Sequence, residues 1–204
     1  MMKLHWSPKS PYVRKVMIVA QETGQLDTFE KVRSVAAMLK PNEALMRDNP
    51  LSKIPTLVLD DGSTLFDSVV ICEYLNDRAG GTFFPTGDAK WPALRWQALG
   101  DGMLDAEILW RNERERSDAS RSDVLIAAFE TKTIAALALL DGEAEALAST
   151  PFAIGHVAVA CALGYLDFRF DAFGWRARAP KLAAWFATVE ARDSYRDTSP
   201  DLGE

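Results

Sequence analysis

The first eighty residues alternate between strand-like and helix-like patterns, and this alternation limits the folds open to the chain. The pattern of residues 3–6 predicts a strand. Residues 11–22 predict a helix that begins at Pro11 and is terminated by the following Gly24. A proline suits the first turn of a helix, because an N–H at that position would have no partner within the helix. The helical period is carried by Val13, Val16, Met17 and Ala20.

The alternation continues to residue 78. Residues 28–35 alternate apolar and polar side chains as a strand does, and residues 37–46 carry a looser helical pattern. Two apolar runs at 56–59 and 64–66 surround a turn, which is a β-hairpin signal. Residues 68–78 complete the region as a helix. The predicted order is β-α-β-α-β-β-α, in which the hairpin adds an antiparallel edge to a parallel pair of strands.

The composition changes after Gly80-Gly81, and residues 81–88 are predicted to form a linker. The chain is thus divided into domains of residues 1–80 and 89–204. Helices of the second domain are predicted over residues 92–116, 124–148, 153–170 and 180–192. The third is apolar nearly all round, as a helix in the centre of a bundle is. Polar residues from Asp193 onward predict a loose tail.

Charge and composition exclude several classes of function. The net charge of −6 provides no basic footprint for nucleic acid. The start of the chain lacks the apolar core of a signal peptide, and the longest apolar stretch, Val157–Leu163, is too short to span a bilayer. Cys72 and Cys161 lie in apolar helical patterns without a CxxC motif, as buried structural thiols do. We therefore expect a cytoplasmic protein without nucleic-acid or membrane partners.

Ser10 stands where the first predicted strand is followed by the first predicted helix. Free N–H groups and the helix dipole favour an anion at this point. A hydroxyl there can donate a hydrogen bond to a thiolate and help to lower the pKa of the thiol. Serine is also a preferred N-cap residue, which explains Ser10 without any ligand. Ser7 is a nearby rival for either role.

Two further motifs have the same double interpretation. Pro55, after Ile54, is either a tolerated first residue of a strand or a cis-proline that presents the Ile54 backbone to a ligand. Lys53 suits either solvent or a ligand carboxylate. Asp67 and Ser68 precede a helix, and either residue can cap it. The same helix start can bind a carboxylate, and Asp67 can pair with an ammonium group.

Together these motifs resemble the glutathione transferase superfamily, in its soluble bacterial form with serine at the catalytic position. The resemblance rests on residues 10–15, 49–55 and 65–71, and on residues 161–169 in the second domain. It covers essentially the whole chain. It implies a thioredoxin-like α/β first domain and an all-helical second domain.

The resemblance also implies a glutathione site on the first domain. Ser10 would donate a hydrogen bond to the sulfur. The backbone of Ile54, beside the structural cis-proline Pro55, would pair with the cysteinyl part. Asp67 and Ser68 would hold the γ-glutamyl end. No metal is implied.

Lys40 and Lys53 would favour the glycyl carboxylate of glutathione. Lys40 lies in an irregular segment, where a solvated lysine is an equally good interpretation. The second substrate would lie between the domains, with residues at helical spacing on one side and a tyrosine opposite: Met103, Glu107, Trp110 and Arg111, with Tyr165. Core or interface packing explains this spacing equally well.

Serine at position 10 bears on the type of chemistry. Within the resembled superfamily, cysteine at this position favours thiol exchange through mixed disulfides, whereas serine favours activation of the glutathione thiol. The resemblance thus implies a homodimeric transferase that conjugates glutathione to a small hydrophobic electrophile. Two alternatives stay open: a non-catalytic glutathione-binding or stress-related interaction protein, and a glutathione-dependent isomerase or dehalogenase.

One position departs from the family pattern. Members usually begin the buried helix with a Ser/Thr-x-x-Asp capping box, and the matching residues here are Ala153 and His156. We expect neither side chain to perform the usual capping. Ser149 or Thr150 could cap one turn earlier, and His156 as a catalytic base is a remote option. We expect this departure from the capping box to affect the folding stability more than the activity.

Overall fold

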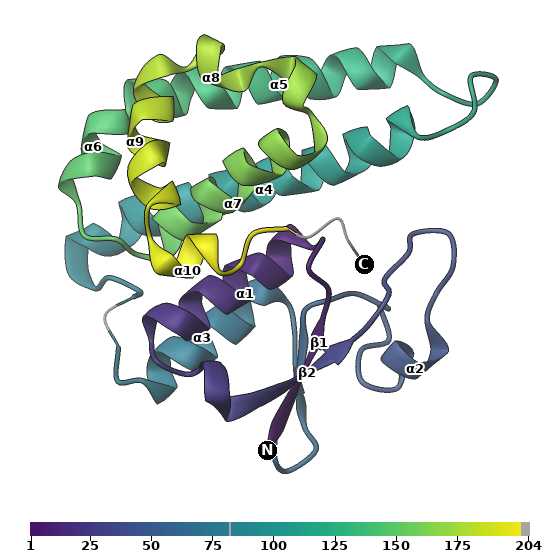
Figure 1. Ribbon diagram of the computed structural model, residues 1–204, viewed down its shortest axis with the longest axis vertical. Helices are drawn as coiled ribbons and strands as arrows, with labels where there is room; N and C mark the ends of the chain where they lie inside the picture. The colour runs from purple at the N-terminus through teal and green to yellow at the C-terminus, as the bar shows by residue number, and fades with distance from the viewer. Residues whose placement is uncertain (82, 201–204) are drawn as a thin grey trace. The chain divides into compact units, whose positions relative to one another are not determined.

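The computed structural model describes residues 1–81 and 83–200, and it divides the chain into two compact units (Figure 1). The first unit comprises Met1–Pro85 together with the chain from Asp193 onward, and the second comprises Thr86–Arg192. The first is an α/β unit with a four-stranded mixed sheet, and the second is helical. The predicted fold class, a thioredoxin-like domain followed by an all-helical one, is confirmed.

The sheet of the first unit has the strand order β2-β1-β3-β4. Its strands are β1 (Met2–Trp6), β2 (Phe29–Arg33), β3 (Thr56–Val58) and β4 (Thr64–Leu65). β1 is parallel to β2 and antiparallel to β3, and β4 is antiparallel to β3. The predicted parallel pair with a hairpin edge is therefore present. Leu4 and Leu57, which pair across β1 and β3, have no exposed surface and lie in the core.

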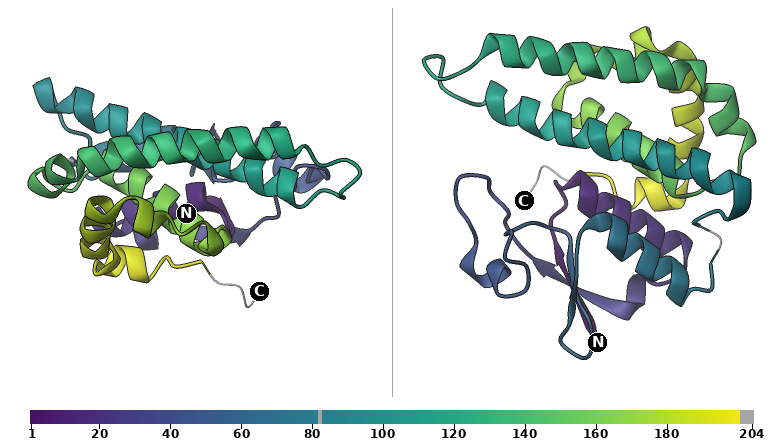
Figure 2. Two further views of the ribbon diagram at one scale, coloured as in Figure 1. Left: turned by 90° about the horizontal axis from the view of Figure 1, so that it is seen from above. Right: turned by 180° about the vertical axis from the view of Figure 1, so that it is seen from behind.

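Two helices pack together on one side of the sheet, namely α1 (Pro11–Glu22) and α3 (Ser68–Arg78). The short α2 (Glu43–Met46) lies on the other side, as the front and back views show (Figures 1 and 2). The prediction of a helix over 37–46 is wrong for residues 37–42. Pro41 disfavours helical backbone at the residue before it. Asn42 then caps α2 by accepting hydrogen bonds from two N–H groups.

The prediction of a loose tail from Asp193 onward is also wrong for the described residues 193–200, and residues 201–204 lie outside the described part of the chain. Residues Asp193–Arg196 form α10, which packs on α1. Tyr195 is 6% exposed, and the Ser194 hydroxyl donates a hydrogen bond to Glu22 of α1 (2.6 Å). The sequence suggests a solvated tail because its polar residues outnumber the apolar ones. Those polar groups instead have partners on α1, more than 170 residues away in sequence.

The second unit is built from α-helices joined by short connections. Its helices are α4 (Lys90–Arg114), α5 (Asp123–Gly142), α6 (Ala144–Ser149), α7 (Ile154–Arg169), α8 (Trp175–Arg178) and α9 (Pro180–Glu190). Single 3-10 turns are η1 (Leu26–Thr28) in the first unit, and η2 (Gly87–Ala89) and η3 (Asp171–Phe173) in the second. The helix predicted over 124–148 is divided at Glu143, whose carboxylate accepts a hydrogen bond from the Trp96 indole (2.7 Å). None of the helices in the described ranges has the length and apolar character needed to cross a bilayer.

The central helix α7 packs closely along α4. Gly100 of α4 and Gly155 of α7 permit this approach: a Cβ on Gly100 would lie 2.5 Å from the Ala158 carbonyl carbon, and one on Gly155 would lie 2.6 Å from the Ala93 oxygen. These contacts run in the same sense along both helices, so α4 and α7 are parallel. The expectation of a buried central helix is confirmed, because residues 154–166 are all buried.

His156 corrects the expectation that the start of α7 is uncapped. The Ala153 N–H donates a hydrogen bond to Nδ1 of His156 (3.1 Å), which is the half of a capping box that the third helical residue normally supplies. Since Nδ1 accepts, the ring proton is on Nε2, which lies 3.1 Å from the Leu147 carbonyl oxygen. Burial is the main cause that lowers the pKa of His156, so the neutral ring that this pattern requires is favoured.

Candidate functional site at one end of the sheet

The strand register places the three predicted motifs at one end of the sheet. β1 ends at Trp6, a few residues before Ser10. His5 pairs with Thr56, the residue after Pro55. Leu57 pairs with Leu65, so continuing this register brings residue 67 level with residue 55. The starts of α1 and α3 therefore lie at the same end of the sheet as the Ile54–Pro55 peptide.

Ser10 is the N-cap of α1. Its Oγ accepts a hydrogen bond from the Val13 N–H (3.3 Å), and its backbone is extended. The Ser7 hydroxyl instead accepts from the Lys9 N–H (3.4 Å), so Ser7 is not the cap. In the described part of the chain, the hydroxyl proton of Ser10 has no acceptor. Capping uses the oxygen as an acceptor, and the proton stays available to an anion.

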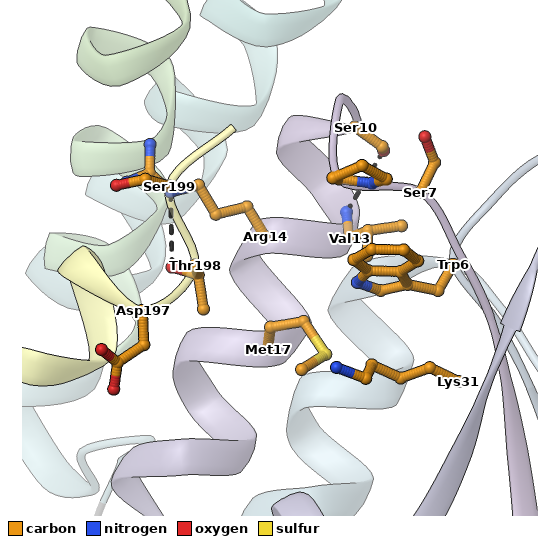
Figure 3. Close-up of a pocket in the computed structure, with 11 residues that line it drawn as sticks. Trp6, Ser7, Ser10, Val13, Arg14, Met17, Lys31, Asp197, Thr198 and Ser199 are labelled. Carbon is orange, nitrogen blue, oxygen red and sulfur yellow. Dashed lines mark hydrogen bonds between the residues drawn. The ribbon is translucent and has the colours of Figure 1, made fainter. Parts of the chain in front are cut away.

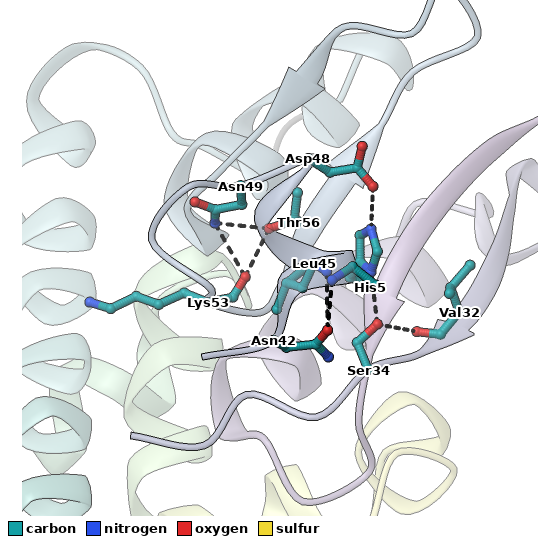
Figure 4. Close-up of polar contacts among 10 residues, drawn as sticks. His5, Val32, Ser34, Asn42, Leu45, Asp48, Asn49, Lys53 and Thr56 are labelled. Carbon is teal, nitrogen blue, oxygen red and sulfur yellow. Dashed lines mark hydrogen bonds and ion pairs between the residues drawn. The ribbon is translucent and has the colours of Figure 1, made fainter. Parts of the chain in front are cut away.

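The Ile54–Pro55 peptide bond is cis, the form that the resemblance implies. Among the described residues, neither the N–H nor the C=O of Ile54 has a hydrogen-bond partner, so its backbone can pair with an extended peptide. The loop is held by Asn49, which is 1% exposed and donates through Nδ2 to the Lys53 carbonyl (3.2 Å) and the Thr56 hydroxyl (3.0 Å) (Figure 4). Asn49 therefore positions the loop, a role that its place in the motif did not reveal.

Asp67 caps α3 through Oδ1, which accepts from the Val69 N–H (2.9 Å). Its side chain is exposed, whereas Ser68, the first residue of the helix, is 3% exposed. The same carboxylate can thus cap the helix and face an ammonium group. The first N–H groups of α3 lie beside it and can receive a carboxylate.

Lys40 and Lys53 are both exposed. The Asn42 N–H donates to the Ser52 hydroxyl (2.9 Å), which ties the segment that carries Lys40 to the segment that carries Lys53. Lys53 directly precedes Ile54, and its side chain runs away from the Asn49 hydrogen bonds (Figure 4). Lys40 takes part in an isolated bridge with Ala37.

The buried side chain of His5 ties the segment that contains α2 to the sheet. His5 of β1 is 8% exposed, and it makes hydrogen bonds through Nδ1 to the Ser34 hydroxyl (2.7 Å) and through Nε2 to Asp48 (2.8 Å) (Figure 4). Ser34 follows β2, and Asp48 follows α2. One side chain therefore anchors both ends of the segment that contains α2. The partners are 29 and 43 residues away in sequence, which is why sequence patterns gave no sign of this network.

A small pocket of about 70 Å³ opens along α1 beside Ser10 (Figure 3). All of its walls come from the first unit. The lining residues are Trp6, Ser7, Pro8, Ser10, Val13, Arg14, Met17, Lys31, Asp197, Thr198 and Ser199. The contribution of the last three could not be expected from a tail predicted to be loose.

The residues expected to line a second-substrate pocket lie in the helical unit and are buried. Met103, Glu107, Trp110 and Tyr165 are each at most 5% exposed. Burial raises the pKa of Glu107 well above 4.5, and neither of its carboxyl oxygens has a hydrogen-bond partner in the described residues. The Arg111 guanidinium donates a hydrogen bond to the Tyr165 hydroxyl (3.4 Å). Their role towards a second substrate stays a prediction.

Comparison with known proteins decides the family. Residues 9–78 match the model of the glutathione S-transferase N-terminal domain, and residues 123–188 match that of the C-terminal domain. An uncharacterized GST-like protein of Escherichia coli K12, YibF, is 32% identical over 203 residues, which cover 98% of each chain. The chain belongs to the glutathione S-transferase family. Ser10 is therefore the N-cap of the first helix in a member of the glutathione S-transferase family.

Solved structures of other family members support the same assignment. A glutathione transferase family member from Pseudomonas fluorescens Pf-5, solved with bound glutathione, is 41% identical with a TM-score of 0.95, covering 99% of this chain and 100% of that one. A glutathione S-transferase from Methylobacillus flagellatus KT, solved with glutathione bound, is 34% identical with a TM-score of 0.89, covering 98% and 100%. These relatives match the first unit and the second alike.

Proposed function

We propose that this family member binds glutathione on its first unit and conjugates the thiolate to a small hydrophobic electrophile. The observation that carries the proposal is the arrangement at the end of the sheet, where two helix N-termini flank the unpaired backbone of Ile54. Glutathione presents a thiol in the middle of a peptide and a carboxylate at each end. The unpaired backbone of Ile54 suits the peptide, the start of α1 favours the thiolate, and the start of α3 favours one of the carboxylates.

Each part of glutathione is assigned to a different set of protein groups. The Ile54 backbone, held by the cis-proline Pro55, pairs with the cysteinyl residue. Asp67 receives the γ-glutamyl ammonium group, and Ser68 with the N–H groups of α3 receives the adjacent carboxylate. Lys53 and Lys40 favour the glycyl carboxylate. The two relatives solved with bound glutathione support glutathione as the ligand.

Ser10 acts on the sulfur in this proposal. Its oxygen accepts a hydrogen bond from the Val13 N–H, which leaves the hydroxyl proton available for donation to the thiolate. A hydrogen bond to the anion, together with the positive end of the α1 dipole, lowers the pKa of the bound thiol. The thiolate then attacks the electrophile and the leaving group departs with its electrons. Serine forms no covalent intermediate in this scheme.

The remaining parts of the proposal concern the partner molecules. Met103, Glu107, Trp110 and Tyr165 contribute to the second-substrate site. The protein acts in the cytoplasm as a homodimer, for which the 43% exposed Val70 on α3 provides apolar surface in the first unit. Measurement of the molar mass in solution by light scattering tests the dimer directly.

Ser10→Ala tests the role of the hydroxyl. We expect turnover of a generic aryl halide to fall at least tenfold, because one donor to a developing anion is worth about 2–4 kcal/mol. The affinity for glutathione should change little. Loss of the cap should also cost about 1 kcal/mol of folding stability, so activity must be measured well below the unfolding temperature.

Ser122→Ala is the matched control. Ser122 caps α5 through the same bond, its Oγ accepting from the Leu125 N–H at 3.3 Å, so its replacement causes a comparable loss of stability. Activity should persist in that variant. Unchanged turnover in Ser10→Ala would remove Ser10 from the mechanism. Glutathione binding by the wild type without turnover of any electrophile would favour the non-catalytic alternative, and turnover that regenerates glutathione would favour an isomerase or a dehalogenase.

A further inference from the structure

His5 is a buried histidine for which the proposed reaction has no use. It is 8% exposed, and its ring bonds to residues at both ends of the segment 35–48, which we call the α2 segment. Nδ1 lies 2.7 Å from the Ser34 hydroxyl, and Nε2 lies 2.8 Å from Oδ2 of Asp48 (Figure 4). The Asp48 carboxylate can only accept, so Nε2 donates. His5, Ser34 and Asp48 are called the His5 tether below.

The α2 segment has little apolar packing of its own. Within residues 35–48, all of which the structure describes, Leu45 is the only buried residue. The large apolar side chains that are at least 40% exposed are Val35, Met38, Leu39 and Met46. Burial of one leucine offsets only part of the backbone entropy that is lost when a segment of this length is ordered. Hydrogen bonds at the ends of the segment therefore contribute much of its order.

Two further hydrogen bonds place the α2 segment beside the loop that leads to Ile54. The Asn42 N–H, inside the segment, donates to the Ser52 hydroxyl (2.9 Å). Asn49, which directly follows the tether, donates through Nδ2 to the Lys53 carbonyl (3.2 Å). The position of the α2 segment and the position of this loop are thus coupled through short hydrogen bonds.

We propose that the His5 tether positions the α2 segment for recognition of the glycyl end of glutathione. The inference rests on the proposed function, which assigns the glycyl carboxylate to Lys40 and Lys53. Lys40 lies on the α2 segment, and Lys53 lies in the loop to which that segment is bonded. Holding the two pieces of chain together before the ligand arrives lowers the entropic cost of binding. His5 acts through the α2 segment and is a positioning residue.

The test compares glutathione with γ-glutamylcysteine, which lacks the glycyl residue. Isothermal titration calorimetry on the full chain gives the Kd of each ligand. His5→Phe keeps an aromatic ring in the core and removes both hydrogen bonds of the tether. We expect the Kd for glutathione to rise roughly fivefold to tenfold, about the value of one hydrogen bond, and the Kd for γ-glutamylcysteine to change less than about twofold. Damage to the whole first unit would weaken both ligands alike.

Milder variants keep the test informative where His5→Phe fails to fold. Ser34→Ala and Asp48→Ala each release one end of the α2 segment and should weaken glutathione binding in the same selective way. Asp48→Asn retains an oxygen that accepts from Nε2 of His5, so most of the affinity should return. In the variants that release the segment, hydrogen exchange followed by mass spectrometry should become faster in residues 35–48 and change little in residues 11–22.

Ser194→Ala is the matched control. It removes another buried hydrogen bond of the first unit, the one that Ser194 of α10 donates to Glu22 of α1 (2.6 Å). It leaves the tether and the α2 segment intact. The affinities for both ligands should therefore equal those of the wild type.

The outcomes separate the inference from the function on which it rests. A wild type that binds neither ligand would overturn both. A wild type that binds glutathione and γ-glutamylcysteine equally well would overturn the inference alone, because no recognition of the glycyl end would exist. Glutathione binding that is unchanged in His5→Phe, or lost in proportion with γ-glutamylcysteine binding, would also overturn it. An Asp48→Asn protein as weak as Asp48→Ala would remove the hydrogen bond to His5 from the explanation.

Discussion

At the scale of single residues, His156 performs part of a capping function with an unusual group. A carboxylate at this position would accept a hydrogen bond from the Ala153 N–H at any pH above its own pKa. The imidazole can do so only when Nδ1 is unprotonated. The lowered pKa of His156, caused mainly by its burial, extends the pH range over which the cap persists.

This cap predicts a pH dependence of stability. Below the ordinary histidine pKa of 6.5 the unfolded chain binds a proton that the folded chain resists, so the free energy of unfolding falls as pH decreases from 6.5 to the lowered pKa of the folded state. Denaturant unfolding at neutral pH and at about pH 5 measures the loss. His156→Gln keeps an acceptor for the Ala153 N–H and does not titrate, so its loss should be smaller. Equal losses in both proteins would contradict the assignment.

Ser10 shows the limit of inference from one residue. Its pattern predicts a helix cap, and the structure has that cap. Whether it also faces a ligand depends on Ile54 and Asp67, which are distant in sequence and are brought level with it by strand register. Asn49 and His5 support the same region through buried hydrogen bonds. Those roles could not be assigned from sequence, because their partners depend on how the chain folds back on itself.

At the scale of elements, most helices and strands follow from local patterns. The bounds of α1 and α3 agree with prediction, because each has a clear cap at its start and a regular period. The exceptions have identifiable causes. Pro41 removes the start of the helix predicted over 37–46, and a hydrogen bond from Trp96 holds the carboxylate of Glu143 where the helix predicted over 124–148 divides. The second cause is tertiary and has no local signal.

The parallel packing of α4 and α7 predicts opposite effects for two glycines of α4. Gly100→Ala places a Cβ 2.5 Å from the backbone of α7, so we expect a loss of at least about 2 kcal/mol in the free energy of unfolding. Gly102→Ala meets nothing within 4 Å and should stabilise the helix by about 0.5–1 kcal/mol. Chemical denaturation measures both. A Gly100→Ala protein as stable as the wild type would contradict the close approach of the two helices.

At the scale of the whole molecule, the division into units does not follow chain order. The C-terminal residues from Asp193 onward belong with the first unit. Deletion of the chain after Arg192 should therefore loosen α1 more than α7, because α1 loses the hydrogen bonds from Arg14 to Tyr195 and the hydrogen bond from Ser194 to Glu22. Hydrogen exchange followed by mass spectrometry measures this. Faster exchange in residues 11–22 with little change in residues 154–169 is expected, and the reverse would contradict the assignment of this segment to the first unit.

The order of strands and helices in residues 1–80 could be predicted from the sequence, because helical and strand periods, caps and turns are local properties of the chain. The fold class and the family were implied by the resemblance of its motifs to a known superfamily. The sequence also identified the motifs at residues 10, 54–55 and 67–68. The tertiary structure brings these motifs to one end of the sheet, where Asn49 and His5 support them, and it joins Arg14 of α1 to Tyr195 and Thr198 of the C-terminal segment. Such contacts join residues up to 184 positions apart, and their partners are chosen by packing, which no local pattern encodes.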